Sequence, residues 1–176
     1  TRERALLVAR ELADAHGLEQ LTMRRLAEEL GIEAMSLYLY HHMPNKDAIL
    51  DGIVDLVFAE IDQPATDVDW RTAMRLRAGA VRRVLLRHPW ALRLVESRTA
   101  AGIATLTHHD AVLGCLRAGG MSVELTAHAY AVLDSYIYGF VLTELNLPFQ
   151  TTEETHAVAA SMFNQFPLAR IPTSWS

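Results

Sequence analysis

Four side chains around Gly31 are of types that bind phosphate groups or the edges of nucleic-acid bases. Thr22 is followed closely by Arg24 and Arg25, and Lys46 lies further along the chain. Hydroxyl, guanidinium and ammonium groups donate hydrogen bonds to phosphate oxygens, and arginine also reads base edges in the major groove. These residue types indicate DNA recognition, provided that the fold places them on one surface.

Histidines and a cysteine raise two other kinds of chemistry. His41-His42 and His108-His109 are adjacent pairs, and neighbours on a helix point about 100 degrees apart, so neither pair can chelate a metal as an i, i+4 pair can. Cys115 lies in an apolar helical pattern without a catalytic signature nearby. We therefore expect no metal site, no cofactor and no catalytic residue, and we interpret the protein as a non-enzyme.

Composition limits the class of protein. The 176 residues are 51% hydrophobic and 21% charged, a globular composition with enough apolar residues for a core. The net charge of -5 argues against a uniformly basic, nonspecific nucleic-acid binder, although it describes no single face. A single cysteine allows no intrachain disulfide and fits a reducing cytoplasm. Charged residues flank the most apolar stretch, so we expect no membrane span.

The elements that must position these side chains are helices. Helical periodicity runs through almost the whole sequence, and no segment alternates apolar and polar residues for long. We predict an all-α protein whose helices end at glycines and prolines. The expected helices cover residues 2–16, 23–30, 34–40, 46–61, 70–88, two shorter segments within 90–118, then 123–147 and 152 or 153 to 165, with a linker at about 62–69.

Two of the expected helices are short and meet at Gly31. Thr22 is a suitable N-cap for the first of them, and apolar residues recur from Met23 at i+3, i+4 and i+7. Two short helices joined by such a turn predict a helix-turn-helix, in which the second helix enters the major groove of DNA. An amphipathic hairpin inside a helical bundle, with solvated arginines, fits the same pattern.

A longer motif favours the DNA-binding interpretation. From "HGLEQLT" through "MRRLAEELGI" and "SLY" to "PNKDAIL", the sequence resembles the DNA-binding domain of the TetR family of bacterial transcriptional regulators. The resemblance implies a helix-turn-helix domain over residues 1–47, followed by a helical ligand-binding and dimerisation domain over residues 48–176.

One departure from the family pattern affects the second helix of the motif. Between Gly31 and Lys46 the chain is two residues longer than the pattern, so Tyr38 and Tyr40 compete for the family's tyrosine position. The residue chemistry and the resemblance together give the candidate DNA contacts: Thr22, Arg24, Arg25, Ala34, Met35, Ser36, Tyr38, Tyr40, His42 and Lys46.

The resemblance continues more loosely in "LLRHPWALRLVESR" and in "LRAGGMSVELTAHAYAVLDSYIYGFVLTE". Polar and aromatic groups on otherwise apolar helices could orient a small ligand there, or be satisfied within the core or at the surface. "LVESR" stands where tetracycline-binding relatives carry a metal-binding histidine, so tetracycline is a poor candidate. The candidate ligand-binding residues are Trp90, Arg98, His109, Tyr130, Asp134 and Tyr138.

A stripe of small residues marks the long helix near the C-terminus. Ala127, Ala131, Ser135 and Gly139 follow one another at i+4 steps, which allows another backbone to approach closely. The partner is a second copy of the chain or another helix of the same chain. A homodimer is favoured because two-fold pairing places two reading helices in successive major grooves.

The interpretation as a whole is a cytoplasmic, homodimeric regulator. We expect it to bind palindromic double-stranded operator DNA, most simply as a repressor that a small-molecule inducer releases. The hypothesis from another class is a helical small-molecule-binding or enzymatic bundle that does not bind DNA.

Overall fold

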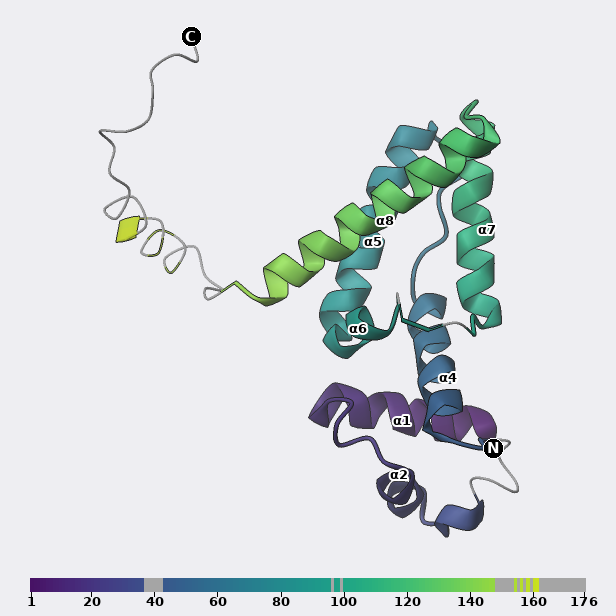
Figure 1. Cartoon of the computed structure of the whole chain (residues 1–176), viewed down its shortest axis with the longest axis vertical. Coiled ribbons are helices and arrows are strands. Elements are labelled where there is room, and N and C mark those ends of the chain that lie inside the picture. The colour runs from purple at the N-terminus through teal and green to yellow at the C-terminus, as the bar shows by residue number, and fades with distance from the viewer. Residues whose placement is uncertain are drawn as a thin grey trace. The chain divides into compact units, whose positions relative to one another are not determined.

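The computed structural model describes residues 1–36, 43–95, 97–98 and 100–147, together with positions 154, 156, 158, 160 and 161. Every regular element within these stretches is helical, which confirms the predicted all-α class (Figure 1). Residues 1–142 form one compact unit, and residues 143–176 form a second. No helix in the described part of the chain is both long and apolar enough to cross a membrane.

The helices follow the expected order. They are α1 (Arg2–His16), α2 (Met23–Leu30), α4 (Lys46–Ala59), α5 (Trp70–Arg87), the 3-10 turn η1 (Pro89–Ala91), α6 (Leu92–Val95), α7 (Ile103–Ala118) and α8 (Val123–Leu145). Residues 34–36 are also helical, as are the described positions from 154 to 161. The expectation of two shorter helices between residues 90 and 118 is confirmed by α6 and α7, of which α7 runs for 16 residues without interruption at Gly114.

Side-chain caps fix where the first helices begin and end. The Thr22 hydroxyl accepts a hydrogen bond from the Arg25 amide at 3.1 Å, and the Asn45 side chain accepts one from the Ala48 amide at 2.9 Å. Gly31 ends α2 with φ +67°, in the left-handed region that glycine adopts without strain. These caps confirm the predicted limits of α2 and the predicted start of α4.

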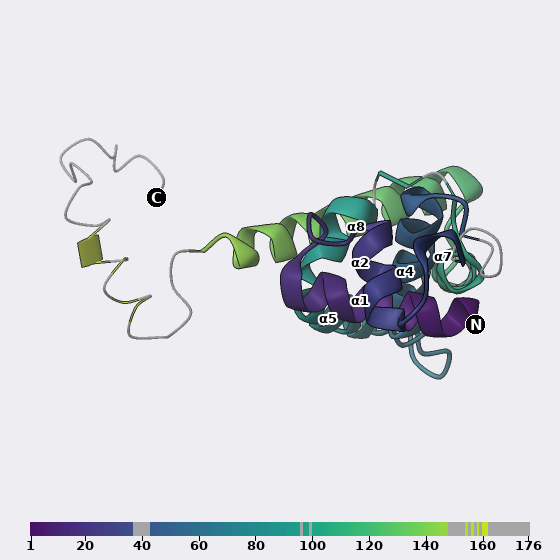
Figure 2. The ribbon, with the colours of Figure 1, turned by 90° about the horizontal axis from the view of Figure 1, so that it is seen from below.

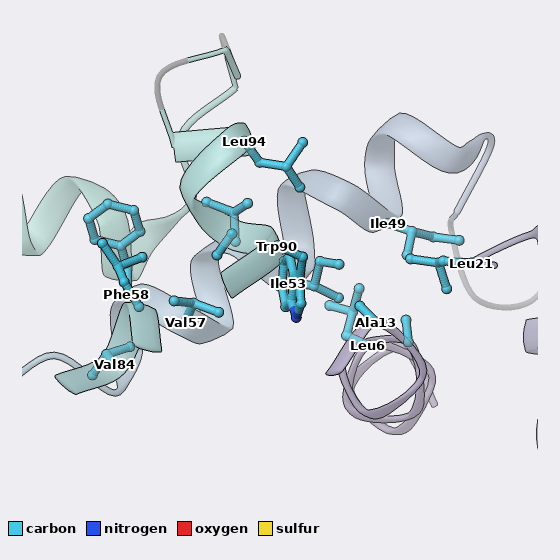
Figure 3. Close-up of a cluster of buried hydrophobic side chains, with 14 of the residues drawn as sticks. Leu6, Ala13, Leu21, Ile49, Ile53, Val57, Phe58, Val84, Trp90 and Leu94 are labelled. Carbon is cyan, nitrogen blue, oxygen red and sulfur yellow. The ribbon is translucent and has the colours of Figure 1, made fainter. Parts of the chain in front are cut away.

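Helix α4 connects two groups of helices through one apolar core (Figure 3). Its first half buries Ile49 and Ile53 in a cluster that includes Leu6 of α1, and its second half extends the same cluster with Phe58. Trp90 of η1 also belongs to this cluster. Because the core is continuous, α4 packs against α1 at one end and against α5 and η1 at the other.

We call α1, α2 and residues 34–36 the head, and α5 to α8, with η1, the body. Figure 1 shows α4 running from the head towards α6 and α7, and Figure 2, seen from below, looks onto α1 and α2. Helix α4 contacts α1 on the side of the head and α6 and α7 on the side of the body. Residues 62–69 contain no helix, in agreement with the predicted linker.

Candidate functional site

The first turn of α2 carries two arginines, of which Arg24 is exposed and Arg25 is half-buried. Arg24 leaves 86% of its side chain exposed and forms only a 3.5 Å ion pair with Glu28, one turn along the helix. Arg25 donates to the Gln20 side chain at 3.3 Å, which directs its guanidinium towards the turn that precedes α2. Leu26 is fully buried on the opposite side. Helix α2 therefore keeps Arg24 in solvent and packs Leu26 into the apolar core behind it.

Residues 34–36 form the start of the helix that follows α2 and Gly31. Met35 is 63% exposed, whereas Ala34 and Ser36 are half-buried. Of the other candidate DNA contacts, Tyr38, Tyr40 and His42 lie outside the described residues. The competition between Tyr38 and Tyr40 for the family position thus stays open.

Lys46 has a structural contact that the sequence pattern did not predict. Its ammonium group donates to the carbonyl of Leu18 at 3.1 Å and so ties the start of α4 to the turn between α1 and α2. An ammonium has three N–H donors, so this bond leaves donors for a phosphate.

Arg98 joins the body to the start of α4. Its Nε donates to Asp51 at 2.6 Å and its Nη1 to Asp47 at 2.9 Å. The two carboxylates raise the pKa of the guanidinium, with the hydrogen bond to Asp51 as the main cause. Arg98 was predicted to bind a ligand, but in the structure its guanidinium contacts the helix that leads to the head.

A third aspartate on the same face of α4 caps helix α7. Asp55 accepts hydrogen bonds from the Thr105 amide at 2.8 Å and from the Thr105 hydroxyl at 2.9 Å. A Cβ on Gly102 would lie 2.1 Å from the Asp55 carboxyl carbon, so any other residue there would displace the carboxylate that caps α7. One face of α4 therefore binds both Arg98 and Thr105, along two turns of helix.

Trp90 lies at the contact between the body and α1. Its indole donates to Asp14 at 2.6 Å, and the same carboxylate oxygen is 2.7 Å from His88 Nδ1. The other ring nitrogen of His88 is 3.2 Å from Glu60. The ligand role of Trp90 stays a prediction, and in the structure its indole joins η1 to the head.

A buried polar cluster joins α5, α7 and α8. Arg77, which is 2% exposed, donates to Asp134 at 2.6 Å through Nη2 and to His108 Nε2 at 3.1 Å through Nε. Two polar atoms in it have no hydrogen-bond partner within the described residues, Arg77 Nη1 and His108 Nδ1. Buried donors of this kind are costly unless a further group accepts from them.

Burial also sets the protonation states in the cluster. It lowers the pKa of His108 to about 4, with the charge of Arg77 adding to the effect, so the imidazole is neutral at neutral pH. Burial and the nearby Asp134 carboxylate raise the pKa of Tyr130. The ring of His109 contacts Tyr130 edge-on, with the ring centroids 5.5 Å apart.

Three of the six predicted ligand residues meet in this cluster. They are His109, Tyr130 and Asp134, whereas Tyr138 is buried in the apolar core. Sequence reasoning missed Arg77 and His108. A signal was present, because Arg77 falls on the apolar stripe of α5 between the buried residues Met74 and Ala80.

The predicted interface stripe is exposed. The structure leaves all four residues exposed: Ala127, Ala131, Ser135 and Gly139. A Cβ at Gly139 would meet no atom within 4 Å. Large apolar side chains accompany the stripe, among them Tyr136, which is 68% exposed. Isolated exposed apolar residues are ordinary, but a row of them along one helix marks an interaction surface.

Short capped helices with an exposed arginine, joined through α4 to a helical body, define a helix-turn-helix protein with a C-terminal helical domain. Comparison with known proteins agrees with this class. Residues 5–53 match the sequence model of bacterial regulatory proteins of the tetR family, and residues 63–174 match that of the tetracyclin repressor-like C-terminal domain. The chain belongs to the TetR family.

Two curated relatives are regulators. The transcriptional repressor DrrR1 of Streptomyces coeruleorubidus is 35% identical over 147 residues, covering 82% of this chain and 54% of its own. An HTH-type transcriptional regulator of Saccharopolyspora erythraea is 37% identical over 145 residues, covering 82% of this chain and 61% of its own. The chain therefore spans less than two thirds of the length of either relative.

Two solved structures share the fold. ActR of Streptomyces coelicolor in complex with actinorhodin has a TM-score of 0.84 and 28% identity, covering 98% of this chain and 81% of its own. BioQ with its natural double-stranded DNA operator has a TM-score of 0.72 and 25% identity, covering 93% of this chain and 96% of its own.

Proposed function

We propose that the protein is a ligand-responsive, DNA-binding transcriptional regulator of the bacterial cytoplasm, acting as a homodimeric repressor and not as an enzyme. The observation that carries the proposal is the exposed Arg24 on the first turn of α2, beside the half-buried Arg25 and in front of the buried Leu26. The repressor name of DrrR1 and the operator bound to BioQ support it.

DNA recognition is assigned to the exposed side of the head. Thr22 and the first amides of α2 bind a phosphate, Arg24 reads a base edge, and Lys46 uses its remaining donors on the backbone. Ala34 and Met35 offer apolar contacts to thymine methyl groups. Ser36, Tyr38, Tyr40, His42 and Arg25 complete the proposed contact set.

Dimerisation is assigned to α8. The exposed small residues let a second α8 approach closely, and the apolar side chains beside them lose water on contact. Two-fold pairing then places two heads on successive half-sites of palindromic DNA.

Release from DNA is assigned to a small-molecule inducer that binds at the buried polar cluster. His109, Tyr130 and Asp134 contribute polar and aromatic groups, and the unpaired donors on Arg77 and His108 favour a ligand with an acceptor group. The signal reaches the head through α4, whose aspartates hold Arg98 and the start of α7. An inducer that binds better when the heads are wrongly spaced lowers DNA affinity.

The test is fluorescence anisotropy of the protein against a pool of palindromic DNA fragments at two salt concentrations. We expect tight binding to a subset, a steep loss with salt, and a loss of about tenfold or more for Arg24→Ala. Arg75→Ala, which removes an exposed arginine of the body, is the matched control and should bind normally.

One result of this titration would contradict the DNA-binding proposal. If folded, dimeric protein binds no fragment at either salt, the DNA proposal is wrong and the chain is a helical ligand-binding or enzymatic bundle instead.

A further inference from the structure

A hollow of about 560 Å³ opens between the linker that precedes α5 and the second half of α7. It is separate from the buried polar cluster, because none of the cluster's residues lines it. Its size falls within the range of roughly 300 to 1,000 Å³ that is common for small-molecule sites.

Small side chains form the floor of the hollow. Ala111, Gly114, Cys115 and Ala118 share one face of α7, at i, i+3, i+4 and i+7. Gly114 is the informative member, since glycine inside a helix costs about 1 kcal/mol relative to alanine. A Cβ at Gly114 would meet no atom within 4 Å, so packing within the chain does not require glycine there. The missing side chain instead keeps the hollow open.

An aromatic ring forms one wall. Trp70 is half-buried and packs directly against the end of α7, where a Cβ on Gly119 would lie 2.4 Å from the indole. The guanidinium of Arg71 lies 4.5 Å from the centre of the Trp70 ring, so the indole already accepts a cation on its face. Trp70 is the first residue of α5, and the Asp69 side chain caps that helix.

Two carboxylates lie among the lining residues. Asp69 accepts hydrogen bonds from the Thr72 hydroxyl and from the first amides of α5, which hold its pKa below the usual value. Asp110 is exposed on α7, and it forms no ion pair with another described residue. Arg71 offsets one of the two negative charges, so the hollow has a net negative charge.

We propose that this hollow is a second ligand site, which binds an arylalkylamine, an aromatic ring with an alkylammonium group. The ring lies on the small-residue floor of α7 beside Trp70, and the ammonium faces Asp110. The proposal does not depend on DNA binding, because every group that it uses lies in the body or the linker.

Three probes that share one ring system test the charge preference: naphthylethylamine, naphthylethanol and naphthylacetate. Binding to the full chain is measured without DNA, from the anisotropy of naphthalene fluorescence. We expect the amine to bind about five- to tenfold more tightly than the alcohol, and the acetate most weakly.

Two variants locate the site. Asp110→Asn should remove most of the preference for the amine, whereas Asp67→Asn makes the same charge change outside the lining and should preserve it. Gly114→Leu should abolish binding of all three probes, and it should fold because leucine favours a helix more than glycine does.

The reactivity of the single cysteine gives a separate readout. Cys115 lines the hollow, so saturating naphthylethylamine should slow its labelling by a maleimide several-fold in the unmodified protein. Equal affinities for the three probes, no binding at all, or full binding by the Gly114→Leu variant would each overturn the proposal.

Discussion

The head and the body distribute charge in opposite ways. In the head the core is apolar and Arg24 is exposed, whereas in the body Arg77 and Asp134 are buried and Tyr136 is exposed. Buried charged groups and exposed apolar side chains lower the stability of a protein unless partners cover the apolar face and accept hydrogen bonds from the buried donors. The exposed apolar side chains of α8 and the unpartnered donors on Arg77 and His108 are the places that the proposed second copy and the proposed ligand would fill.

The largest expected effect comes from breaking the buried ion pair of the body. Asp134→Ala leaves Arg77 charged and uncompensated, which should lower the free energy of unfolding by about 3 to 5 kcal/mol. Urea denaturation measures the loss. The double variant Asp134→Leu with Arg77→Met removes both charges and should recover most of the stability. If the single variant is as stable as the unmodified protein, the contrast between head and body is wrong.

The exposed apolar face of α8 gives the next largest effect. Tyr136→Glu places a charge at the proposed dimer contact and should weaken dimerisation by about 2 kcal/mol or more, roughly thirtyfold in Kd. Sedimentation equilibrium is the measurement. Leu76→Glu changes an exposed leucine on α5 and is the matched control. Equal dimer affinity for both variants would show that α8 is not the interface.

The neutral His108 makes stability depend on pH. The unfolded chain holds this group at its ordinary pKa of 6.5, and the folded protein lowers it to about 4. Between these values the unfolded state binds more protons, so the free energy of unfolding falls as pH drops. We expect a loss of about 2 kcal/mol from about pH 7.5 to about pH 5.

Denaturation series at several pH values check this. His108→Gln keeps an acceptor for Arg77 without a titrating ring, and it should show a correspondingly shallower dependence. An unchanged pH dependence in that variant would assign the effect to other groups.

The smallest expected effect lies in the head. Thr22→Ala removes the cap of α2 and should cost about 1 kcal/mol of stability. The same change should weaken DNA binding more than the loss of stability accounts for, because the hydroxyl is also a proposed phosphate contact. Thr22→Ser keeps the hydroxyl and is the control. Comparison of chemical denaturation with DNA titration separates the two effects.

Local signals in the sequence were sufficient to predict α1 and α2 of the head. Thr22 and Gly31 predicted both ends of α2, because a cap and a left-handed glycine act within a few residues of the chain. The order of helices and the linker at 62–69 followed from the same kind of signal. The second helix of the motif stays a prediction beyond Ser36, since residues 37–42 are not described.

Pairings in the body depend on distant residues and were harder to predict. Arg77 meets a carboxylate 57 positions away, and nothing near either residue in the sequence specifies the partner. Arg98 shows the same difficulty, since its polar character fitted a ligand role as well as it fits the two aspartates of α4. The predicted domain boundary after residue 47 also remains a prediction, and it falls just inside α4.

The continuous core around α4 has a consequence for protein engineering. A chimera that joins this head to the body of another regulator after residue 47 would cut α4 and separate Ile49 and Ile53 from Leu6. A junction in the linker keeps α4 whole, but the head would then pack against the other protein's residue in place of Trp90. Exchange of reading heads between such proteins therefore requires that the residues of η1 and α6 be transplanted together with α1, α2 and α4.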